Sequence, residues 1–166
     1  MARNLELKIK LKSFNDVQSC LKAANIWQEE ILRQQDTYYK WSKGLLKLRS
    51  VNGRYELIKY SRDEVNRERW SDYFILNITS TDAEGFLDDI LEVEAVVKKT
   101  RQLFLYKNTR IHLDDVFSLG LFLELETVVN ESLDMAKNEF EEVVKILNLD
   151  ISQQIKGSYR NLIMQK

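Results

Sequence analysis

Alternation of charged and apolar residues along successive segments is the feature that most constrains how this chain can fold. In residues 5–12 leucine and isoleucine alternate with glutamate and lysine, and similar alternation returns in residues 109–116 and 122–129. Successive side chains of a β-strand point to opposite faces of its sheet. Each of these segments is therefore predicted to be a strand with one apolar face and one charged face.

Further segments that alternate, or that are rich in β-branched and aromatic residues, bring the predicted total to about eight strands. They are residues 36–41, 45–51, 54–62, 72–78 and 95–106. Asn52-Gly53 predicts a tight hairpin between two of them. Helical spacing of apolar residues, together with capping residues, predicts helices within residues 13–26, 80–92, 131–147 and 152–166.

Composition limits the classes of protein to which the chain can belong. Its 166 residues are enough for one domain with a real core, and we expect a single domain over residues 1–166. The 25 basic and 26 acidic residues argue against general nucleic-acid binding or an anionic-membrane anchor. No apolar stretch approaches the roughly 20 residues of a membrane span, and residues 1–10 lack a signal-peptide core, so a cytoplasmic location is expected. The single cysteine excludes an internal disulfide.

The charged faces have two explanations. An antiparallel sheet with a solvated outer face commonly shows such alternation. Alternatively, helices cover the apolar outside of a curved sheet, and the charges point into its lumen. Lysines and arginines from several strands would repel one another there unless they held anions, so a lumen predicts a polyanionic ligand. Glu124 and Glu126 would repel that ligand unless a divalent cation lay between them, and this combination indicates a triphosphate.

Several short motifs follow one another in the order of a known family. They are NLELKIK at 4–10, QQDTYY at 34–39, GLLKLR at 44–49, ELIKYSR at 56–62, VVKKTRQLF at 96–104, TRIHLDDVFSLGLFLELE at 109–126 and SYRNLI at 158–163. With them the chain resembles the CYTH, or triphosphate tunnel metalloenzyme, superfamily, and within it the bacterial class IV adenylyl cyclase branch. The resemblance implies an α+β fold in which an eight-stranded antiparallel β-barrel forms the tunnel and helices pack outside.

The resemblance also implies a role for each charged position. The implied ligands of Mg²⁺ or Mn²⁺ are Glu6, Asp114, Glu124 and Glu126. The implied catalytic residues are Lys8, Arg49 and Arg110, and the implied substrate-binding residues are Lys10, Lys47, Arg62, Lys99, Arg101 and His112. His112 is expected to orient a neighbour through a hydrogen bond rather than to act as a general base or a metal ligand, because cationic neighbours favour its neutral form. Glu56 and Arg62 form either a lumen ion pair or part of the substrate site.

Asn4 departs from the family pattern, because it stands where the first glutamate of the opening E-x-E-x-K motif would be. An amide offers a metal a neutral oxygen and no charge, so the substitution bears on metal affinity or on the occupancy of a second metal site. In an alternative register Glu6 is the first glutamate and Lys10 the motif lysine. We favour the register in which Lys8 is the motif lysine.

Two reactions and one binding function fit this pattern. In a class IV adenylyl cyclase the ribose 3′-hydroxyl of ATP attacks the α-phosphorus, which yields cyclic AMP and pyrophosphate. In a triphosphatase acting on thiamine triphosphate, inorganic triphosphate or nucleotides, water attacks the terminal phosphorus. A protein that binds triphosphates without turnover is the third alternative, and Asn4 favours it. The expected partner is a small-molecule triphosphate, with no nucleic acid and no membrane, and the resemblance adds a possible homodimer.

Overall fold

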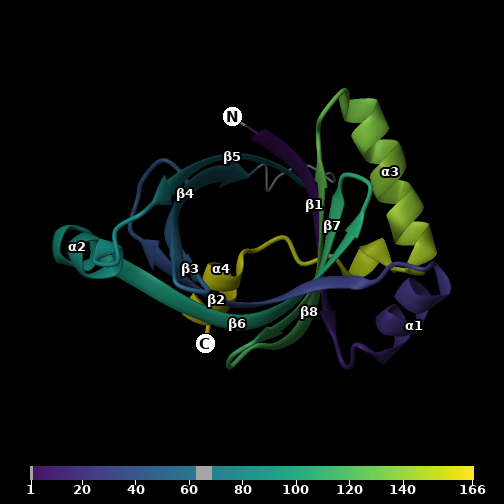
Figure 1. Ribbon diagram of the computed structural model, residues 1–166, viewed down its shortest axis with the longest axis horizontal. Coiled ribbons are helices and arrows are strands. Elements are labelled where there is room, and N and C mark those ends of the chain that lie inside the picture. The colour runs from purple at the N-terminus through teal and green to yellow at the C-terminus, as the bar shows by residue number, and fades with distance from the viewer. Residues whose placement is uncertain (1, 63–68) are drawn as a thin grey trace.

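The computed structural model of the chain describes residues 2–62 and 69–166. Its strands close into one antiparallel barrel in the order β1-β5-β4-β3-β2-β6-β7-β8 (Figure 1). They are β1 (Ala2–Leu11), β2 (Gln28–Tyr39), β3 (Leu45–Val51), β4 (Arg54–Arg62), β5 (Arg69–Ile78), β6 (Val93–Tyr106), β7 (Thr109–Val116) and β8 (Gly120–Val128). The predicted α+β fold with an eight-stranded antiparallel barrel is confirmed.

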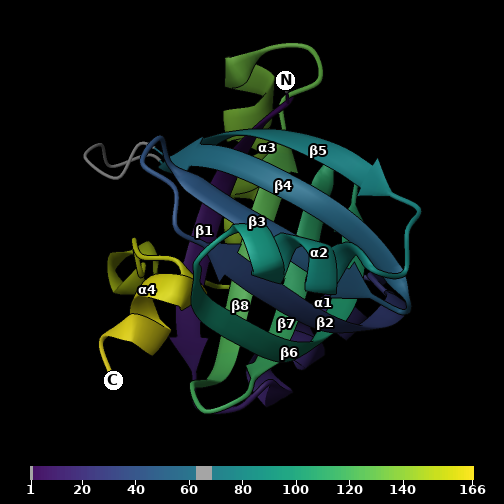
Figure 2. The same cartoon turned by 90° about the vertical axis from the view of Figure 1, so that its left-hand side faces the viewer.

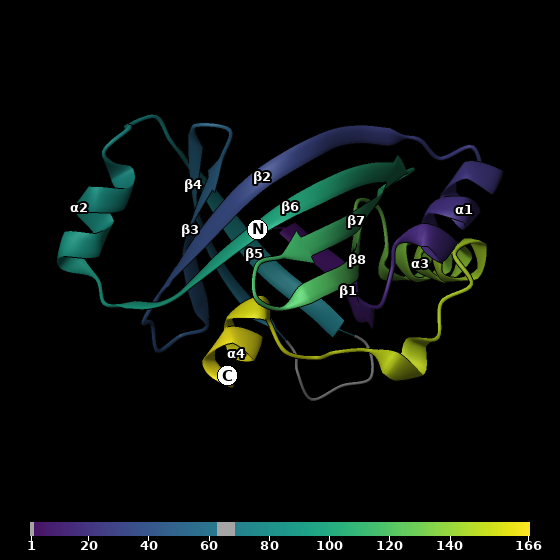
Figure 3. The ribbon, with the colours of Figure 1, turned by 90° about the horizontal axis from the view of Figure 1, so that it is seen from below.

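The helices before residue 150 lie outside the barrel wall, whereas the C-terminal helix lies at one end of the barrel, where its Tyr159 meets Lys8 and Asp114 (Figures 1 and 2). Within the described ranges they are α1 (Asn15–Ala23), α2 (Ala83–Ile90), α3 (Leu133–Ile146), the short 3-10 helix η1 (Ile151–Gln153) and α4 (Tyr159–Met164). Helices α1 and α3 share one side of the barrel, and α2 lies at the opposite side. After α3 the chain runs through η1 to α4 (Figure 3). None of the helices in the described part is both long enough and apolar enough to span a membrane.

The apolar faces of β1, β7 and β8 point outward, toward α1 and α3. In the largest core cluster the strand residues are Leu7, Ile9, Phe104, Ile111, Leu113, Leu123 and Leu125. They meet Val17 and Leu21 of α1 and Val143 of α3, and all of these side chains are buried. Because alternate residues face opposite sides of a strand, the charged residues of the same strands point into the barrel. The alternative of a solvated, charged outer face is therefore wrong for these strands.

Strand β2 begins earlier than predicted. The sequence predicts a strand only from residue 36, whereas β2 starts at Gln28 and follows β6 up to Tyr39. Residues 28–35 read QEEILRQQ, and long polar side chains of this kind favour helices more than strands. Backbone hydrogen bonds to β6 overrule that preference, so the extension depends on a partner far away in the sequence. Helices α1, α2 and α3 begin and end within their predicted ranges, whereas the single helix predicted within residues 152–166 is η1, which begins at Ile151, followed by α4.

The packing of helices on the outer face predicts the effect of truncating a buried leucine. Leu123 on β8 is 0% exposed, whereas Leu105 on β6 is 46% exposed. Leu123→Ala leaves a cavity and should lower the free energy of unfolding by about 2–5 kcal/mol. Leu105→Ala, the matched control, should change it by about 0.5 kcal/mol or less. Urea denaturation followed by circular dichroism measures both, and equal effects would contradict this packing.

Candidate active site

Alternate residues of six strands direct charged side chains into the barrel. We call this group the tunnel cluster. Its cations are Lys8, Lys47, Arg49, Lys99, Arg101 and Arg110, and its carboxylates are Glu6, Asp36, Asp114, Glu124 and Glu126. In the ladders, β1 and β8 set Glu6 opposite Glu126 and Lys8 opposite Glu124. The pairing of the strands thus brings together residues that are more than a hundred positions apart.

Two cavities open into the cluster. The narrower one, of about 90 Å³, is lined by Glu6, Lys47 and Tyr60 among others. The wider one, of about 410 Å³, is lined by charged residues and by the apolar side chains Leu32, Val51 and Leu103. Arg49, Arg110 and Glu126 line both cavities. A ligand that spans the two spaces would therefore touch cations from β3 and β7 and a carboxylate from β8.

Asp36 on β2 holds cations of the neighbouring strand. Its carboxylate accepts hydrogen bonds from Lys47 Nζ at 2.8 Å and from Arg49 Nε and Nη2 at 2.8 and 3.0 Å. Lys99 Nζ lies 4.0 Å away. Burial alone would raise the pKa of Asp36, but these three positive charges hold it well below its ordinary value. Sequence reasoning missed Asp36, although it lies within the motif QQDTYY.

Asp114 on β7 plays the same part for Arg101. Arg101 donates to both carboxylate oxygens, at 2.7 and 2.6 Å, and the hydroxyl of Tyr159 donates at 2.9 Å. Burial would raise the pKa of Asp114, but Arg101 and Lys99 lower it. Both oxygens are thus engaged by the protein. Asp114 thus holds Arg101 in position, and the metal-ligand role that the resemblance implies for it stays a prediction.

The C-terminal segment packs against the cluster. Lys8 Nζ donates to the backbone oxygen of Gly157 at 3.1 Å and lies 3.9 Å from the ring centroid of Tyr159. The backbone of Ile155 donates to the oxygen of Lys8 at 2.8 Å. Tyr159 is 3% exposed, and its ring also lies 4.8 Å from Lys99 Nζ. No periodicity in SYRNLI marks this role, because it arises from a contact with the first and sixth strands.

Burial also affects the cations. Burial, together with the positive charges of Arg49 and Lys99, lowers the pKa of Lys47 to about 7, although Asp36 acts to raise it. Burial and Arg101 lower the pKa of Lys99 as well. Lys47 is consequently close to its titration point at neutral pH, whereas the arginines stay charged.

Glu124 and Glu126 on β8 are held by cations of β1, β6 and β7. Glu124 accepts a hydrogen bond from Arg101 at 2.6 Å, and its other oxygen lies 3.1 Å from Lys8 Nζ. Arg110 Nη2 lies 2.9 Å from Glu126. Burial would raise both pKa values, yet the surrounding positive charges hold that of Glu124 well below its ordinary range and lower that of Glu126 to about 2. Both side chains are therefore ionised at neutral pH.

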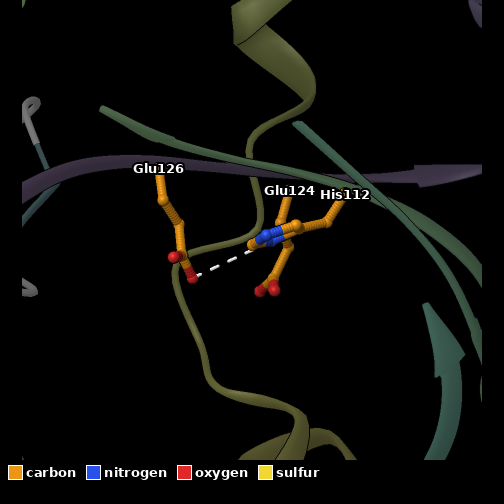
Figure 4. Close-up of side chains that lie close together, drawn as sticks. All are labelled: His112, Glu124 and Glu126. Atoms are coloured by element: carbon orange, nitrogen blue, oxygen red, sulfur yellow. Dashed lines mark ion pairs between the residues drawn. The ribbon is translucent and has the colours of Figure 1, made fainter. Parts of the chain in front are cut away.

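His112 projects toward these two carboxylates (Figure 4). Ligand atoms of His112, Glu124 and Glu126 all lie within 4.8 Å of one another. Burial and the charge of Arg101 lower the pKa of His112 to about 3, so the imidazole is neutral. Among the described residues, none forms a hydrogen bond with its Nδ1. The expected orienting hydrogen bond is thus not made at this atom.

The side chains present fit a divalent cation. Two ionised carboxylates are suitable ligands for Mg²⁺ or Mn²⁺, and Glu6 on β1 lies opposite Glu126 and lines the same narrow cavity. Glu6, Glu124 and Glu126 would hold the metal, in agreement with three of the four positions implied by the resemblance. Asn4 is buried two residues before Glu6. With its amide oxygen turned toward Arg110, it accepts a hydrogen bond from Nη2 at 3.1 Å.

One of the expected substrate-binding residues lies apart from this group. Lys10 is exposed near the end of β1, with its Nζ 5.7 Å from the ring centroid of Phe122. The side chain of Arg62 lies outside the described part of the structure, so its role stays a prediction. Glu56 lies opposite Arg49 in the β3–β4 ladder and lines the wider cavity.

Comparisons with known proteins agree with this architecture. A protein of Methanocaldococcus jannaschii named as a putative adenylate cyclase is 34% identical over 68 residues, which span 40% of this chain and 39% of that protein. The solved structure of PH1012 from Pyrococcus horikoshii has a TM-score of 0.83 and 21% identity, over 96% of this chain and 98% of that one. The solved structure of a putative adenylate cyclase from Vibrio parahaemolyticus has a TM-score of 0.75 and 21% identity, over 96% of this chain and 97% of that one.

A further solved structure differs in the activity ascribed to it. It is the putative adenylyl cyclase HpAC1 from Hippeastrum, described as having a dominant triphosphatase activity, with a TM-score of 0.64 and 14% identity over 98% of this chain and 95% of that one. These likenesses concern the fold. The model of the CYTH domain matches residues 2–159, nearly the whole chain. The chain therefore belongs to the CYTH domain family.

Proposed function

We propose that this chain is a divalent-metal-dependent enzyme that binds ATP in the tunnel and converts it to cyclic AMP and pyrophosphate. The observation that supports this most directly is the contact between cations of the tunnel cluster and the ionised carboxylates of Glu124 and Glu126. Cations attract phosphate oxygens, whereas carboxylates beside them repel phosphate unless a divalent cation binds between. A metal–triphosphate complex satisfies both groups at once.

The cations differ in what they offer a triphosphate. Guanidinium groups present two parallel N–H donors to phosphate oxygens, and ammonium groups act as point charges. The guanidinium groups belong to Arg49, Arg101 and Arg110, and the ammonium groups to Lys8, Lys47 and Lys99. Asp36 and Asp114 fix two of the arginines through paired hydrogen bonds. Donors fixed in advance need little reorganisation during the reaction, which favours charge stabilisation in the transition state.

The wider cavity supports an organic triphosphate over an inorganic one. Its 410 Å³ space combines Leu32, Val51 and Leu103 with the cluster residues Arg49 and Arg110. Apolar side chains next to phosphate-binding cations suit a ligand that carries a base or another ring system on its triphosphate. Inorganic triphosphate would leave this apolar wall without a contact.

In the proposed reaction the ribose 3′-oxygen forms a bond to the α-phosphorus. The bond from that phosphorus to the oxygen bridging the β-phosphate breaks, pyrophosphate leaves with the bonding electrons, and the hydroxyl proton is released. Such a step depends chiefly on alignment and on neutralisation of charge. The divalent cation, held by Glu6, Glu124 and Glu126, supplies part of that neutralisation. The residues of the chain bind and orient the phosphates.

Triphosphate hydrolysis is the second candidate. The tunnel cluster would bind the same phosphates, with water in place of the ribose hydroxyl as the attacking group. The neighbour HpAC1, which is described as having a dominant triphosphatase activity, favours this alternative. Binding without turnover is the third alternative.

Phosphorus NMR of the purified chain with ATP and Mg²⁺ or Mn²⁺ tests the proposed reaction. We expect pyrophosphate and cyclic AMP in equal amounts, and no product when the metal is chelated. Release of orthophosphate from ATP, or from thiamine triphosphate or inorganic triphosphate offered in parallel, would contradict the cyclase reaction and support the triphosphatase reaction. Saturable binding without any product would contradict both reactions.

The two carboxylates of β8 give a second prediction. Changing Glu124 and Glu126 together to glutamine keeps their shape and removes both negative charges, so metal-dependent turnover should fall by about 100-fold or more. Steady-state kinetics at increasing Mn²⁺ measures the loss, and circular dichroism checks that the fold is kept. Glu92→Gln is the control, because that side chain is 69% exposed and outside the tunnel. Undiminished activity in the double variant would contradict the assignment.

Lys47 gives a prediction about protons. Its pKa of about 7 leaves it mostly neutral at pH 8, and the negative charge of bound phosphates favours its protonated form. Binding of ATP at pH 8 should therefore take up close to one proton per ligand. Calorimetric titrations in two buffers with different ionisation enthalpies measure this uptake. Lys47→Arg, which stays charged throughout, should abolish the uptake, and proton release by the unaltered chain would contradict the prediction.

A further inference from the structure

We propose that His112 is itself a ligand of the divalent cation, so that an imidazole nitrogen and the carboxylates of Glu124 and Glu126 hold the metal together. This inference rests on the proposed function only in requiring that a divalent cation binds in the tunnel. It differs from the role expected for His112, which was to orient a neighbour within the substrate site.

The first argument is the surroundings of one atom. His112 is 3% exposed, and its Nδ1 forms no hydrogen bond with any described residue. A buried polar atom is rarely left without a partner, and each exception needs an explanation such as an ion that binds there. Figure 4 shows the ring of His112 next to Glu124 and pointing toward Glu126. The atom without a partner thus lies near the carboxylate of Glu126, one of the proposed metal-holding groups.

The second argument is distance. Nδ1 of His112 lies 4.0 Å from Oε1 of Glu126, which is too long for a hydrogen bond. Two atoms that bind one cation, each about 2.0–2.2 Å from it, lie at most about 4.4 Å apart. The 4.0 Å separation falls inside that limit, so one cation can touch both atoms. The ligand atoms of all three residues lie within 4.8 Å of one another, so Glu124 needs only a small shift to join them.

The third argument is the rigidity of the support. His112 on β7 lies directly opposite Glu124 on β8, and Glu126 follows two residues later on the same face. The ladder between β7 and β8 continues on both sides of this pair. Sites built on paired strands hold their ligands more precisely than sites on loops. The backbone positions of His112, Glu124 and Glu126 are therefore fixed relative to one another.

A nitrogen ligand has a consequence for the choice of metal. Imidazole suits transition-metal ions, whereas Mg²⁺ prefers oxygen ligands. We therefore expect the tunnel to bind Mn²⁺ more tightly than Mg²⁺. Asn4, at the family's first glutamate position, lies beside Arg110 when its amide oxygen accepts from that residue. His112 then supplies the metal with a neutral ligand, whereas the charged ligand of the family's first glutamate position is absent from this chain.

Pulsed electron paramagnetic resonance of the Mn²⁺-loaded chain tests this inference without any substrate. A directly bound imidazole nitrogen modulates the electron spin echo of Mn²⁺ with characteristic frequencies. The chain has one histidine, so an imidazole signal can come only from His112. We expect the signal in the unaltered chain. Bound Mn²⁺ without an imidazole signal would overturn the inference, and so would failure to bind Mn²⁺ at millimolar concentration.

His112→Gln provides the comparison. It should lose the nitrogen signal and bind Mn²⁺ at least about 10-fold more weakly by calorimetry, with a smaller change for Mg²⁺. Lys22→Gln, at an exposed position of α1, should keep both the signal and the affinity. A Mn²⁺ affinity for His112→Gln equal to that of the unaltered chain would overturn the inference. An imidazole signal in a chain that makes no cyclic AMP supports the inference and contradicts the cyclase reaction, so the two failures are distinguishable.

Discussion

Pairing of buried charges of opposite sign is the interaction on which the rest of the structure depends. A lone buried charge costs several kcal/mol, and removing one partner of a buried pair costs about 3–5 kcal/mol. The barrel avoids that cost because neighbouring strands supply both signs: Asp36 on β2 meets cations of β3, and Asp114 on β7 meets Arg101 on β6. Strand register, in turn, is fixed by the apolar residues that face α1 and α3. The outer core therefore decides which charges meet inside.

The same pairing explains how a tunnel of fixed charges can accept a charged ligand. In the proposed complex, Lys8 and Arg101 contact phosphate oxygens in place of Glu124, and the carboxylate of Glu124 binds the metal. Each charge then keeps a partner, whereas binding of the phosphate alone would leave Glu124 beside an anion. Metal and triphosphate should therefore favour each other's binding. Asp36 and Asp114 are not needed in this exchange, so they can keep the arginines in place throughout.

The sequence predicts the parts of the fold that depend on local alternation. It places the charged faces of β1, β7 and β8, and the bounds of β3, β4 and β7 agree with the structure. The first half of β2, the contacts of Asp36 and the packing of Tyr159 on Lys8 depend on partners far away in the sequence. Periodicity carries no information about such partners. For the site, the motifs indicate which charged residues belong to it, and only the structure shows which cation pairs with which carboxylate.

His112 shows how one correct physical argument can lead to two different roles. Cationic neighbours were expected to keep its imidazole neutral, and burial together with Arg101 does lower its pKa to about 3. A neutral imidazole can orient a neighbour through a hydrogen bond, or it can donate a lone pair to a metal. The choice depends on what lies next to the nitrogen. Beside Nδ1 the described residues place no hydrogen-bond partner and one carboxylate oxygen at 4.0 Å, and that arrangement favours the metal.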